Sequence, residues 1–360
     1  MTHQDDKIYL RPSGLVNLAD HGALIETGEV LPLAGGPVGF SWIEIIHRRH
    51  NGQVTKKFLR AADLNIVQDL VDEERVTRLI ETRKPLLNLS WDKPGIMGVL
   101  NVTPDSFSDG GRFFSVEDAA ASARAMFEAG ADIVDIGGES TRPRAEPVDP
   151  QEELRRVMPV FDALNDDANH NLSIDTRKAE IMKAAIDAGA CLINDISALT
   201  YDADSLSVAA VSQVPVVLMH TQGDPTSMQD NPDYDHVLLD VYDYLEERIN
   251  ACEAAGIPRE RLIVDPGIGF GKSVEHNLRL LGGLCLFHGL GCAVLLGASR
   301  KSFIGYLHGA AASDQRLGGS LAAVLVGVAQ GVQLFRVHDV RETHQTVTVL
   351  QGIYGLKKIS

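Results

Sequence analysis

Ile96-Met97-Gly98-Val99-Leu100 is an apolar run that ends on Asn101, and a long polar loop follows it at residues 102–111. A short apolar run bounded by polar residues is typical of a buried strand. Similar runs recur towards the C-terminus, so we expect strands at residues 96–101, 133–137, 172–175, 192–195, 216–220, 262–265, 294–299 and 334–338. Amphipathic stretches between them, among others 116–129, 178–188, 237–255 and 318–329, predict helices.

Strand and helix patterns therefore alternate eight times over about 260 residues, which predicts an α/β protein with a (β/α)8 TIM barrel. A doubly wound open sheet is the alternative. Polar residues stand at the carboxyl end of nearly every predicted strand, whereas an open sheet places its ligands only around its switch point. This distribution favours the barrel.

Residues 1–92 have a different pattern. Short alternating runs at 40–46 and 57–59 flank Asn51-Gly52, a dipeptide that predicts a β-hairpin. Asp72 is a candidate cap for a helix with Val76, Leu79 and Ile80 on one face. We expect a small α+β domain at residues 1–92, without a catalytic constellation, and the barrel at residues 93–360.

The composition limits the function. The chain has 360 residues, 44% of them hydrophobic, and a net charge of −16, which argues against a nucleic-acid partner. No apolar stretch is long enough to span a membrane, and the first residues lack a secretory signal. The four cysteines form no CxxC pair, so we expect reduced thiols and a cytoplasmic protein.

Two sets of polar residues follow the predicted strands. The first set is acidic or neutral and consists of Asp175, Asn194 and Asp265. Buried carboxylates require a partner, and this set suits a flat heterocycle with several N–H donors. A single Asp at a strand end equally well caps a helix or pairs with a basic residue, but three together favour a ligand site.

The second set is basic, and its members are Arg142, Arg144, Arg300, Lys301, Arg336 and His338. Cations at the last barrel strand match the common phosphate site of this fold, and arginine suits phosphate oxygens. Arg336 and His338 alternate with Phe335 and Val337, so both point towards the barrel interior or its mouth. For Arg144 and Arg300, ordinary surface charge is the favoured interpretation.

Three other features bear on the site. The run Gly267–Lys272 does not match the dinucleotide-binding pattern, and we expect its glycines to let the backbone pass close to a ligand. His220 has no second metal ligand at a useful spacing, so we expect a hydrogen-bonded strand-end residue. Asn101 is a candidate contact for a hydrated Mg²⁺ that a phosphate substrate carries, because Mg²⁺ often uses few protein ligands.

Seven segments in order resemble the signatures of the dihydropteroate synthase family, over roughly residues 95–355. They are residues 96–110, residues 135–143, Ile174-Asp175-Thr176, residues 193–196, Asp265-Pro266-Gly267 with Phe270-Gly271-Lys272, Ser299-Arg300-Lys301-Ser302 and residues 336–340. Any one segment is weakly specific, whereas seven in family order are highly specific. Two positions depart from the family pattern, with Arg144 in place of a common Gly and Thr221 in place of a common Met.

The resemblance implies a transferase of folate biosynthesis that joins p-aminobenzoate to 7,8-dihydropterin-6-ylmethyl diphosphate and releases diphosphate. It implies that the pterin contacts Asp175, Asn194, Asp265 and Lys301. The implied diphosphate ligands are Asn101, Thr141, Arg142, Arg336 and His338, with Mg²⁺ at Asn101. The implied aminobenzoate pocket is formed by Phe107, Pro143, Phe270, Ser299 and Lys301. The catalytic candidates are Asp265, Lys301, Asn101 and Arg336. The resemblance also implies that the protein forms a homodimer and is a target of sulfonamides.

We expect the loops after Asn101 and around Arg142 to close over both substrates and exclude water. Two alternatives remain at this point. A methyltetrahydrofolate-dependent methyltransferase module would share the pterin site but needs no diphosphate clamp. A catalytically silent relative would bind pterin without turnover.

Overall fold

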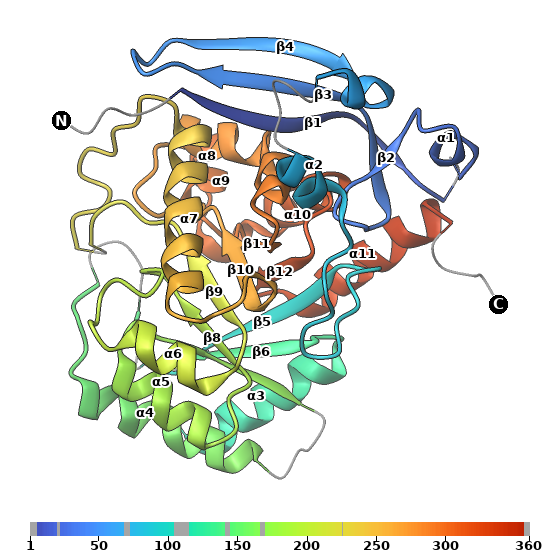
Figure 1. Cartoon of the computed structure of the whole chain (residues 1–360). Coiled ribbons are helices and arrows are strands. Elements are labelled where there is room, and N and C mark those ends of the chain that lie inside the picture. The colour runs from blue at the N-terminus through green and yellow to red at the C-terminus, as the bar shows by residue number, and fades with distance from the viewer. Residues whose placement is uncertain are drawn as a thin grey trace.

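The computed structural model describes residues 6–19, 22–67, 73–103, 115–140, 145–165, 170–224 and 226–355. Its larger part is a closed barrel of eight parallel strands (Figure 1). The strands are β5 (Gly95–Asn101), β6 (Ile133–Gly137), β7 (Asn171–Asp175), β8 (Leu192–Asp195), β9 (Val216–Met219), β10 (Leu262–Asp265), β11 (Ala293–Leu296) and β12 (Leu334–Val337). The predicted (β/α)8 TIM barrel is therefore confirmed, and the open sheet is excluded because β12 pairs with β5.

Helices follow the strands and cover the outside of the barrel (Figure 1). They are α3 (Val116–Glu128), α4 (Pro150–Leu164), α5 (Ala179–Asp187), α6 (Ser205–Ser212), α7 (Val237–Ala254), α8 (Val274–Leu281), α9 (Ser302–Leu307), α10 (Leu317–Ala329) and α11 (Val340–Ile353). The 3-10 segments η3 (Arg259–Arg261), η4 (Leu284–Leu290) and η5 (Ser313–Gln315) lie between them. The predicted helices thus correspond to α3, α5, α7 and α10.

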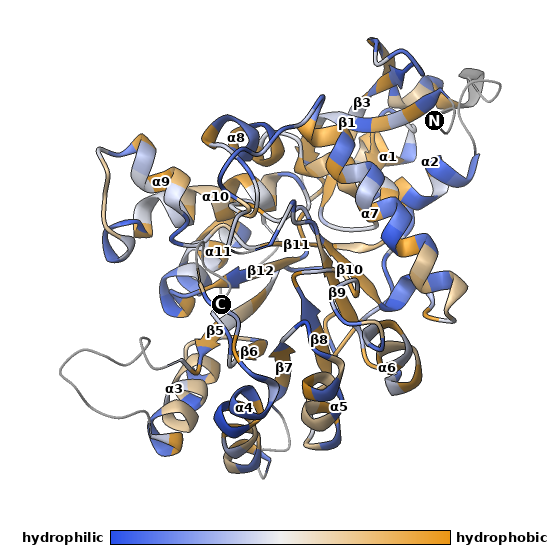
Figure 2. Ribbon diagram, turned by 90° about the vertical axis from the view of Figure 1, so that its left-hand side faces the viewer, coloured by the Kyte–Doolittle hydropathy of each residue, from blue (hydrophilic) through white to orange (hydrophobic). Residues whose placement is uncertain are grey.

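Alternate strand residues fill the barrel with apolar side chains. The interior cluster contains Met97, Ile133, Leu192, Val217, Ile263, Ala293, Leu295 and Leu334, and Leu89 and Trp91 of the preceding segment pack against it. Figure 2 shows the strands mostly orange, with blue hydrophilic stretches on β8 and β12. Because side chains alternate along a strand, residues two positions beyond this layer also point inward, and these include Asp135, Asn194, Asp265 and Arg336.

The N-terminal part is an antiparallel sheet. Its strands are β1 (Lys7–Asn17), β2 (Leu31–Pro32), β3 (Val38–Arg48) and β4 (Val54–Arg60), and its helical segments are α1 (Gly22–Glu26), η1 (Ala61–Val67) and α2 (Glu73–Ile80). β3 and β4 form the predicted hairpin, in which Arg48 pairs with Val54 around a turn whose Gly52 has φ +81°. The hairpin prediction is confirmed. The proposed cap of α2, Asp72, lies outside the described residues.

This sheet lies against one side of the barrel, beside η4, α7 and α10 (Figure 1). One shared apolar cluster joins the two parts, since Leu10, Ile43, Ile45 and Leu79 pack with Cys285 of η4. The division into domains at residue 92 stays a prediction, because both parts contribute to this cluster.

The four cysteines carry free thiols, and Cys252, Cys285 and Cys292 are buried, as expected for core residues. Among the described residues, no helix combines the length and the hydropathy needed to cross a lipid bilayer.

Candidate active site

The register of the barrel gathers the predicted site residues at one rim. Asn101 pairs with Gly137, Gly137 with Asp175, and Asp175 with Asn194, so these strand ends stand side by side. Asp265 ends β10 in register with Met219 of β9. Parallel strands bring their carboxyl ends to the same face of a barrel, which is the face where TIM-barrel enzymes carry their active sites.

An ion-pair network lies at the centre of this rim. Arg336 Nε donates to Asp135 Oδ2 and Arg336 Nη2 donates to Asp175 Oδ2, both at 2.6 Å. Asn194 Nδ2 also donates to Asp135 Oδ2, at 2.8 Å. Both carboxylates are buried. The acidic and basic sets of the sequence analysis therefore touch each other through Arg336.

Burial and shared charge change the proton affinity of this network. Burial raises the pKa of Asp175 to about 7, against the lowering effect of Arg336 and with a further increase from Asp135. Burial disfavours the charged form of Arg336, but the carboxylates of Asp135 and Asp175 outweigh it and raise its pKa. The guanidinium is therefore permanently charged, whereas Asp175 titrates near neutral pH.

Asp135 is a member of this network, and it was expected among the polar groups at the strand ends but in neither the acidic nor the basic set. Its Oδ1 atom is buried and accepts no hydrogen bond from the described residues. A buried carboxylate oxygen without a donor is costly, so this atom is a ready acceptor for a ligand N–H group. The sequence signal was an acid inside the apolar run Ile133–Gly137, two positions before the strand end and therefore on the inward face.

Asp265 faces the same space as Arg336. A side chain at Gly297 would lie 3.5 Å from Asp265 Oδ2 and 3.9 Å from the Cβ of Arg336, so the absent side chain leaves the gap between them open. Asp265 Oδ1 accepts the backbone N–H of Gly267 at 2.7 Å. Burial raises the pKa of Asp265, while the Gly267 N–H and Lys301 oppose the increase.

Phe270 and Lys301 are also brought together as predicted. Lys301 Nζ lies 4.0 Å from the centroid of the Phe270 ring, within the range of a cation–π contact. Gly269, with φ +84°, leaves room for this arrangement, since a Cβ there would lie 3.1 Å from Lys301 Cδ. The glycine-rich run thus lets a cationic side chain lie close to the backbone.

Ser299 and His338 form a separate contact. Ser299 Oγ accepts the backbone N–H of His338 at 3.2 Å and lies 3.1 Å from His338 Nδ1. Burial, together with the nearby positive charge of Arg336, lowers the pKa of His338 to about 3. His338 is therefore a neutral imidazole at pH 7, and it can offer a ligand a hydrogen bond rather than a charge.

Lys272 and His220 hold the loop that follows Asp265. Lys272 Nζ is 2.9 Å from both His220 Nδ1 and the carbonyl oxygen of Phe270, and 3.3 Å from the carbonyl oxygen of His220. The ammonium is buried, and burial lowers its pKa to about 7. His220 is a hydrogen-bonded strand-end residue, as expected, but sequence reasoning gave Lys272 no role beyond its place in a motif.

A second buried ion cluster lies beside the rim. Lys178 Nζ is 2.5 Å from Glu139 Oε2 and from Glu153 Oε2, and Arg177 Nη2 is 2.7 Å from Glu139 Oε1. The cluster ties Glu139, at the end of β6, to the residues that follow β7. Arg300, in contrast, pairs with Asp339 at a partly exposed position.

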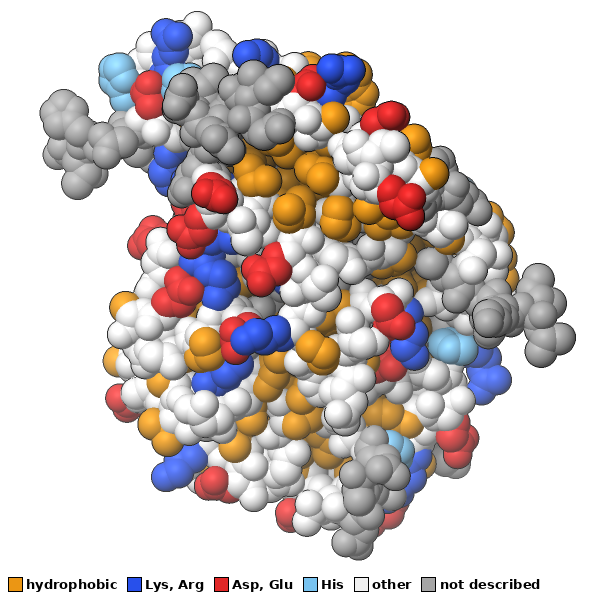
Figure 3. Space-filling model, turned by 45° about the vertical axis from the view of Figure 1, so that its right-hand side comes forward, with side chains coloured by type: hydrophobic (Ala, Val, Ile, Leu, Met, Phe, Trp, Pro, Cys, Tyr) orange, Lys and Arg blue, Asp and Glu red, His pale blue; other side chains and the backbone are white. Residues whose placement is uncertain are grey.

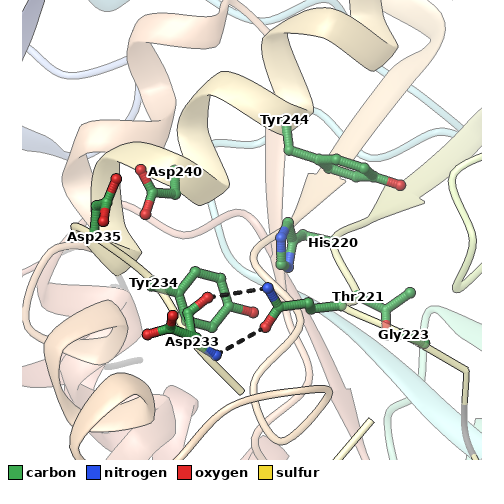
Figure 4. Close-up of a pocket in the computed structure, with 9 residues that line it drawn as sticks. His220, Thr221, Gly223, Asp233, Tyr234, Asp235, Asp240 and Tyr244 are labelled. Carbon is green, nitrogen blue, oxygen red and sulfur yellow. Dashed lines mark hydrogen bonds between the residues drawn. The ribbon is translucent and has the colours of Figure 1, made fainter. Parts of the chain in front are cut away.

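An open cavity of about 570 Å³ lies beside the residues that follow β9. It is lined by His220, Thr221, Gln222, Gly223, Asp233, Tyr234, Asp235, Asp240 and Tyr244 (Figure 4). None of the predicted ligand-binding residues lines this cavity. His220 borders this cavity and also contacts Lys272, so the cavity adjoins the loop that follows Asp265.

Several predicted residues belong to segments without a described structure. Phe107, Thr141, Arg142, Pro143 and Arg144 lie outside the described residues, and the closure of their loops stays a prediction. Within the described part of the chain, no group of three or more His, Cys, Asp or Glu side chains could hold a metal ion. Asn101 ends β5 at the rim, and its Mg²⁺ contact stays a prediction.

Comparison with known proteins gives a consistent result. The pterin binding enzyme family matches residues 97–338. Dihydropteroate synthase of Escherichia coli K12 is 46% identical over 271 residues, which cover 75% of this chain and 95% of that protein. A structure of Xanthomonas albilineans dihydropteroate synthase with 4-aminobenzoic acid has 49% identity and a TM-score of 0.70, and covers 74% of this chain and 94% of that one.

A Yersinia pestis dihydropteroate synthase structure with a sulfonamide drug matches with 44% identity and a TM-score of 0.71, and covers 76% of this chain and 98% of that one. The barrel and its rim of carboxylates, amide and cations thus define a pterin-binding enzyme. Within that class, the chain belongs to the dihydropteroate synthase family of transferases. The N-terminal sheet precedes the family match, which begins at residue 97.

Proposed function

We propose that this chain condenses 7,8-dihydropterin-6-ylmethyl diphosphate with p-aminobenzoate to give 7,8-dihydropteroate and diphosphate, a step of folate biosynthesis. The observation that carries the proposal is the shared space between Asp265 and the Arg336 network. In this space, hydrogen-bond acceptors for a pterin ring lie beside hydrogen-bond donors for a diphosphate. Xanthomonas albilineans dihydropteroate synthase has been solved with 4-aminobenzoic acid and with 7,8-dihydropteroate.

The pterin would lie against Asp175, Asn194, Asp265 and Lys301. Carboxylate and amide oxygens suit the N–H groups of a pterin edge, and the unpartnered Asp135 Oδ1 adds one more acceptor. Burial removes water from these groups and so strengthens each contact. Lys301 would approach the ring from the side of Phe270.

The diphosphate would be held by Asn101, Thr141, Arg142, Arg336 and His338. A guanidinium has five N–H donors, and the pairs with Asp135 and Asp175 use Nε and Nη2, so Nη1 remains for an anion as far as the described residues go. His338 would contribute a neutral N–H donor. The amide oxygen of Asn101 would contact a hydrated Mg²⁺ that binds mainly to the substrate, and the ion would neutralise charge on the leaving diphosphate.

The chemistry needs electrostatic stabilisation more than proton transfer. The C–O bond to diphosphate breaks, and the positive charge that develops on the methylene is shared by the pterin ring. Asp265 would stabilise that charge, while Arg336 stabilises the departing anion. The amine nitrogen of p-aminobenzoate then forms the C–N bond and loses one proton to solvent. The pocket that directs this amine would be formed by Phe107, Pro143, Phe270, Ser299 and Lys301.

Diphosphate release from the two purified substrates tests the proposal. We expect stoichiometric diphosphate and dihydropteroate. A methyltransferase module would release no diphosphate, and a silent relative would bind pterin without turnover. Asp265→Asn should weaken pterin binding about 10- to 150-fold, since a hydrogen bond to a charged group contributes about 1.5–3 kcal/mol. Unchanged pterin affinity in a calorimetric titration would refute the role of Asp265.

We also propose a homodimer in the cytoplasm and sulfonamide sensitivity. The outward faces of α10 and α11 expose Leu325, Val326, Val349 and Ile353, and Figure 3 shows one face of the molecule on which hydrophobic side chains gather in a band. Exposed apolar patches mark interaction surfaces, which supports self-association. Light scattering on Val326→Glu tests the dimer, and a fall to the monomer mass is expected.

A further inference from the structure

Arg48 of the N-terminal sheet contacts the start of the barrel helix α7. Arg48, the last residue of β3, has its Nη1 atom 2.5 Å from Asp240 Oδ1 and 3.6 Å from Asp243 Oδ2, and its Nη2 atom 3.7 Å from Asp235 Oδ2. The side chain of Arg48 is only 12% exposed. A charge-assisted contact with this little solvent access is stronger than an ordinary surface pair.

Asp240 fixes the start of α7. Its Oδ2 atom accepts the backbone N–H of His236, which caps the helix, at 2.9 Å. The residues just before the helix are held as well, because Gln222 Nε2 donates to the carbonyl oxygen of Asp233 at 3.0 Å and Gln222 Oε1 accepts the Asp233 N–H at 3.3 Å. Tyr234 and Asp235 therefore lie on a short segment fixed at both ends (Figure 4).

Tyr234 connects this segment to the loop of the active site. Its hydroxyl donates to the carbonyl oxygen of Gly271 at 2.7 Å, and burial raises its pKa, so the donor keeps its proton. Gly271 has φ +59°, and a Cβ there would lie 2.5 Å from the carbonyl oxygen of Gln222. The loop is thus packed backbone to backbone against the segment that Arg48 helps to fix.

Gly271 follows Phe270, whose ring lies under Lys301. We propose that the N-terminal sheet positions the aminobenzoate wall of the active site, through Arg48, the start of α7 and the Tyr234–Gly271 hydrogen bond. This proposal rests on the proposed placement of p-aminobenzoate against Phe270. Arg48 and Tyr234 are positioning residues, since neither is among the residues expected to contact a substrate.

The experiment uses the full chain and measures both Michaelis constants and kcat. Arg48→Gln and Tyr234→Phe should each raise the KM for p-aminobenzoate about fivefold, the change that matches one ordinary hydrogen bond. The KM for the pterin diphosphate should stay within about twofold. Arg48→Lys, which keeps the charge but not the forked donor, should restore part of the lost affinity.

Lys7→Gln is the matched control. Lys7 also joins the sheet to α7, with Nζ 2.8 Å from Asp243 Oδ1, but it does not contact Asp240 or Asp235. It should leave both KM values unchanged. If Lys7→Gln and Arg48→Gln raise the KM for p-aminobenzoate equally, the Arg48 connection is refuted and only general contact with the sheet matters.

The double variant Arg48→Gln/Tyr234→Phe tests whether the two residues act on one connection. A combined effect clearly smaller than the product of the single effects supports the connection, and a fully multiplicative effect overturns it.

Phe270→Ala separates this inference from the proposed function. If Phe270→Ala leaves the KM for p-aminobenzoate unchanged, the placement of that substrate is wrong. If it raises that KM and Arg48→Gln does not, the inference about the sheet is wrong. Thermal unfolding of each variant identifies any that fail to fold.

Discussion

The two sides of the rim are built differently. On one side, Arg336, Asp135, Asp175 and Asn194 interact through charged and polar side chains. On the other side, the loop after Asp265 is fixed through its backbone: Gln229 donates to the Gly269 carbonyl, Lys272 to the Phe270 carbonyl and Tyr234 to the Gly271 carbonyl. The first side offers a ligand charged groups that are already oriented by their ion pairs. The second side offers a surface whose shape is fixed by hydrogen bonds to the backbone. Substitutions should therefore act on them in different ways.

Arg336→Met should have the largest effect. It leaves Asp135 and Asp175 buried without their shared cation, and removing one partner of a buried ion pair costs about 3–5 kcal/mol. Urea denaturation measures this loss, and turnover should fall at least 100-fold because the proposed donor to the diphosphate would be lost as well. Both substrates should be affected, since the guanidinium also holds Asp135 and Asp175, the acids proposed to face the pterin.

Arg300→Met is the control for Arg336→Met. Arg300 pairs with Asp339 and its side chain is 33% exposed, and such pairs contribute at most about 1 kcal/mol. If both variants lose the same stability, the ion-pair network at the rim is not energetically distinct from a partly exposed salt bridge.

On the backbone-fixed side, Gly267→Ala should be nearly as damaging. Gly267 has φ +68°, and a Cβ there would lie 1.9 Å from the carbonyl oxygen of His220. The left-handed backbone costs a non-glycine residue about 1–2 kcal/mol, and the overlap adds about 1–3 kcal/mol. The free energy of unfolding should fall and the KM for p-aminobenzoate should change, because the loop must move.

Gly256→Ala isolates the backbone cost. Gly256 has φ +89°, and a Cβ there would meet nothing within 4 Å, so only the strain of the left-handed conformation applies. If Gly256→Ala and Gly267→Ala lose the same free energy of unfolding, close packing against His220 contributes nothing.

The sequence predicted the barrel strands better than it predicted the N-terminal sheet. Barrel strands were recognised because each is a buried apolar run, and their predicted limits agree closely with β5 to β8 and β10. For β9, β11 and β12 the predicted ends run one to three residues too far, since those residues turn into the loops that carry His220, Ser299 and His338. Strand β1 was missed, because Pro12 and Gly14 interrupt its pattern.

Partners across the rim could not be predicted. Arg336 and Asp135 are 201 residues apart in sequence, and only closure of the barrel between β12 and β5 brings them together. The sequence indicated which residues point inward but not which of them pair. The role of Lys272 was also hidden, because its acceptors include two backbone carbonyl oxygens.

The charged side should respond to pH. Burial raises the pKa of Asp175 to about 7 from an ordinary value of 3.8, so between those values the native state binds more protons than the unfolded state. The free energy of unfolding should therefore fall as pH rises from about 4 to about 7, by up to about 1.4 kcal/mol per pH unit. Asp175→Asn removes this dependence. A constant difference between wild type and variant over that range would contradict the assigned shift.

The smallest expected effect falls between the two sides. The resemblance assigns Ser299 to the aminobenzoate pocket, yet its hydroxyl contacts His338, a predicted diphosphate ligand. Ser299→Ala removes one acceptor at a cost of about 0.5–1.5 kcal/mol. If Ser299 acts by holding His338, the KM for the pterin diphosphate should rise a few-fold while the KM for p-aminobenzoate stays constant. The opposite pattern would place Ser299 with Phe270 and Lys301 and would extend the backbone-fixed side of the rim to β11.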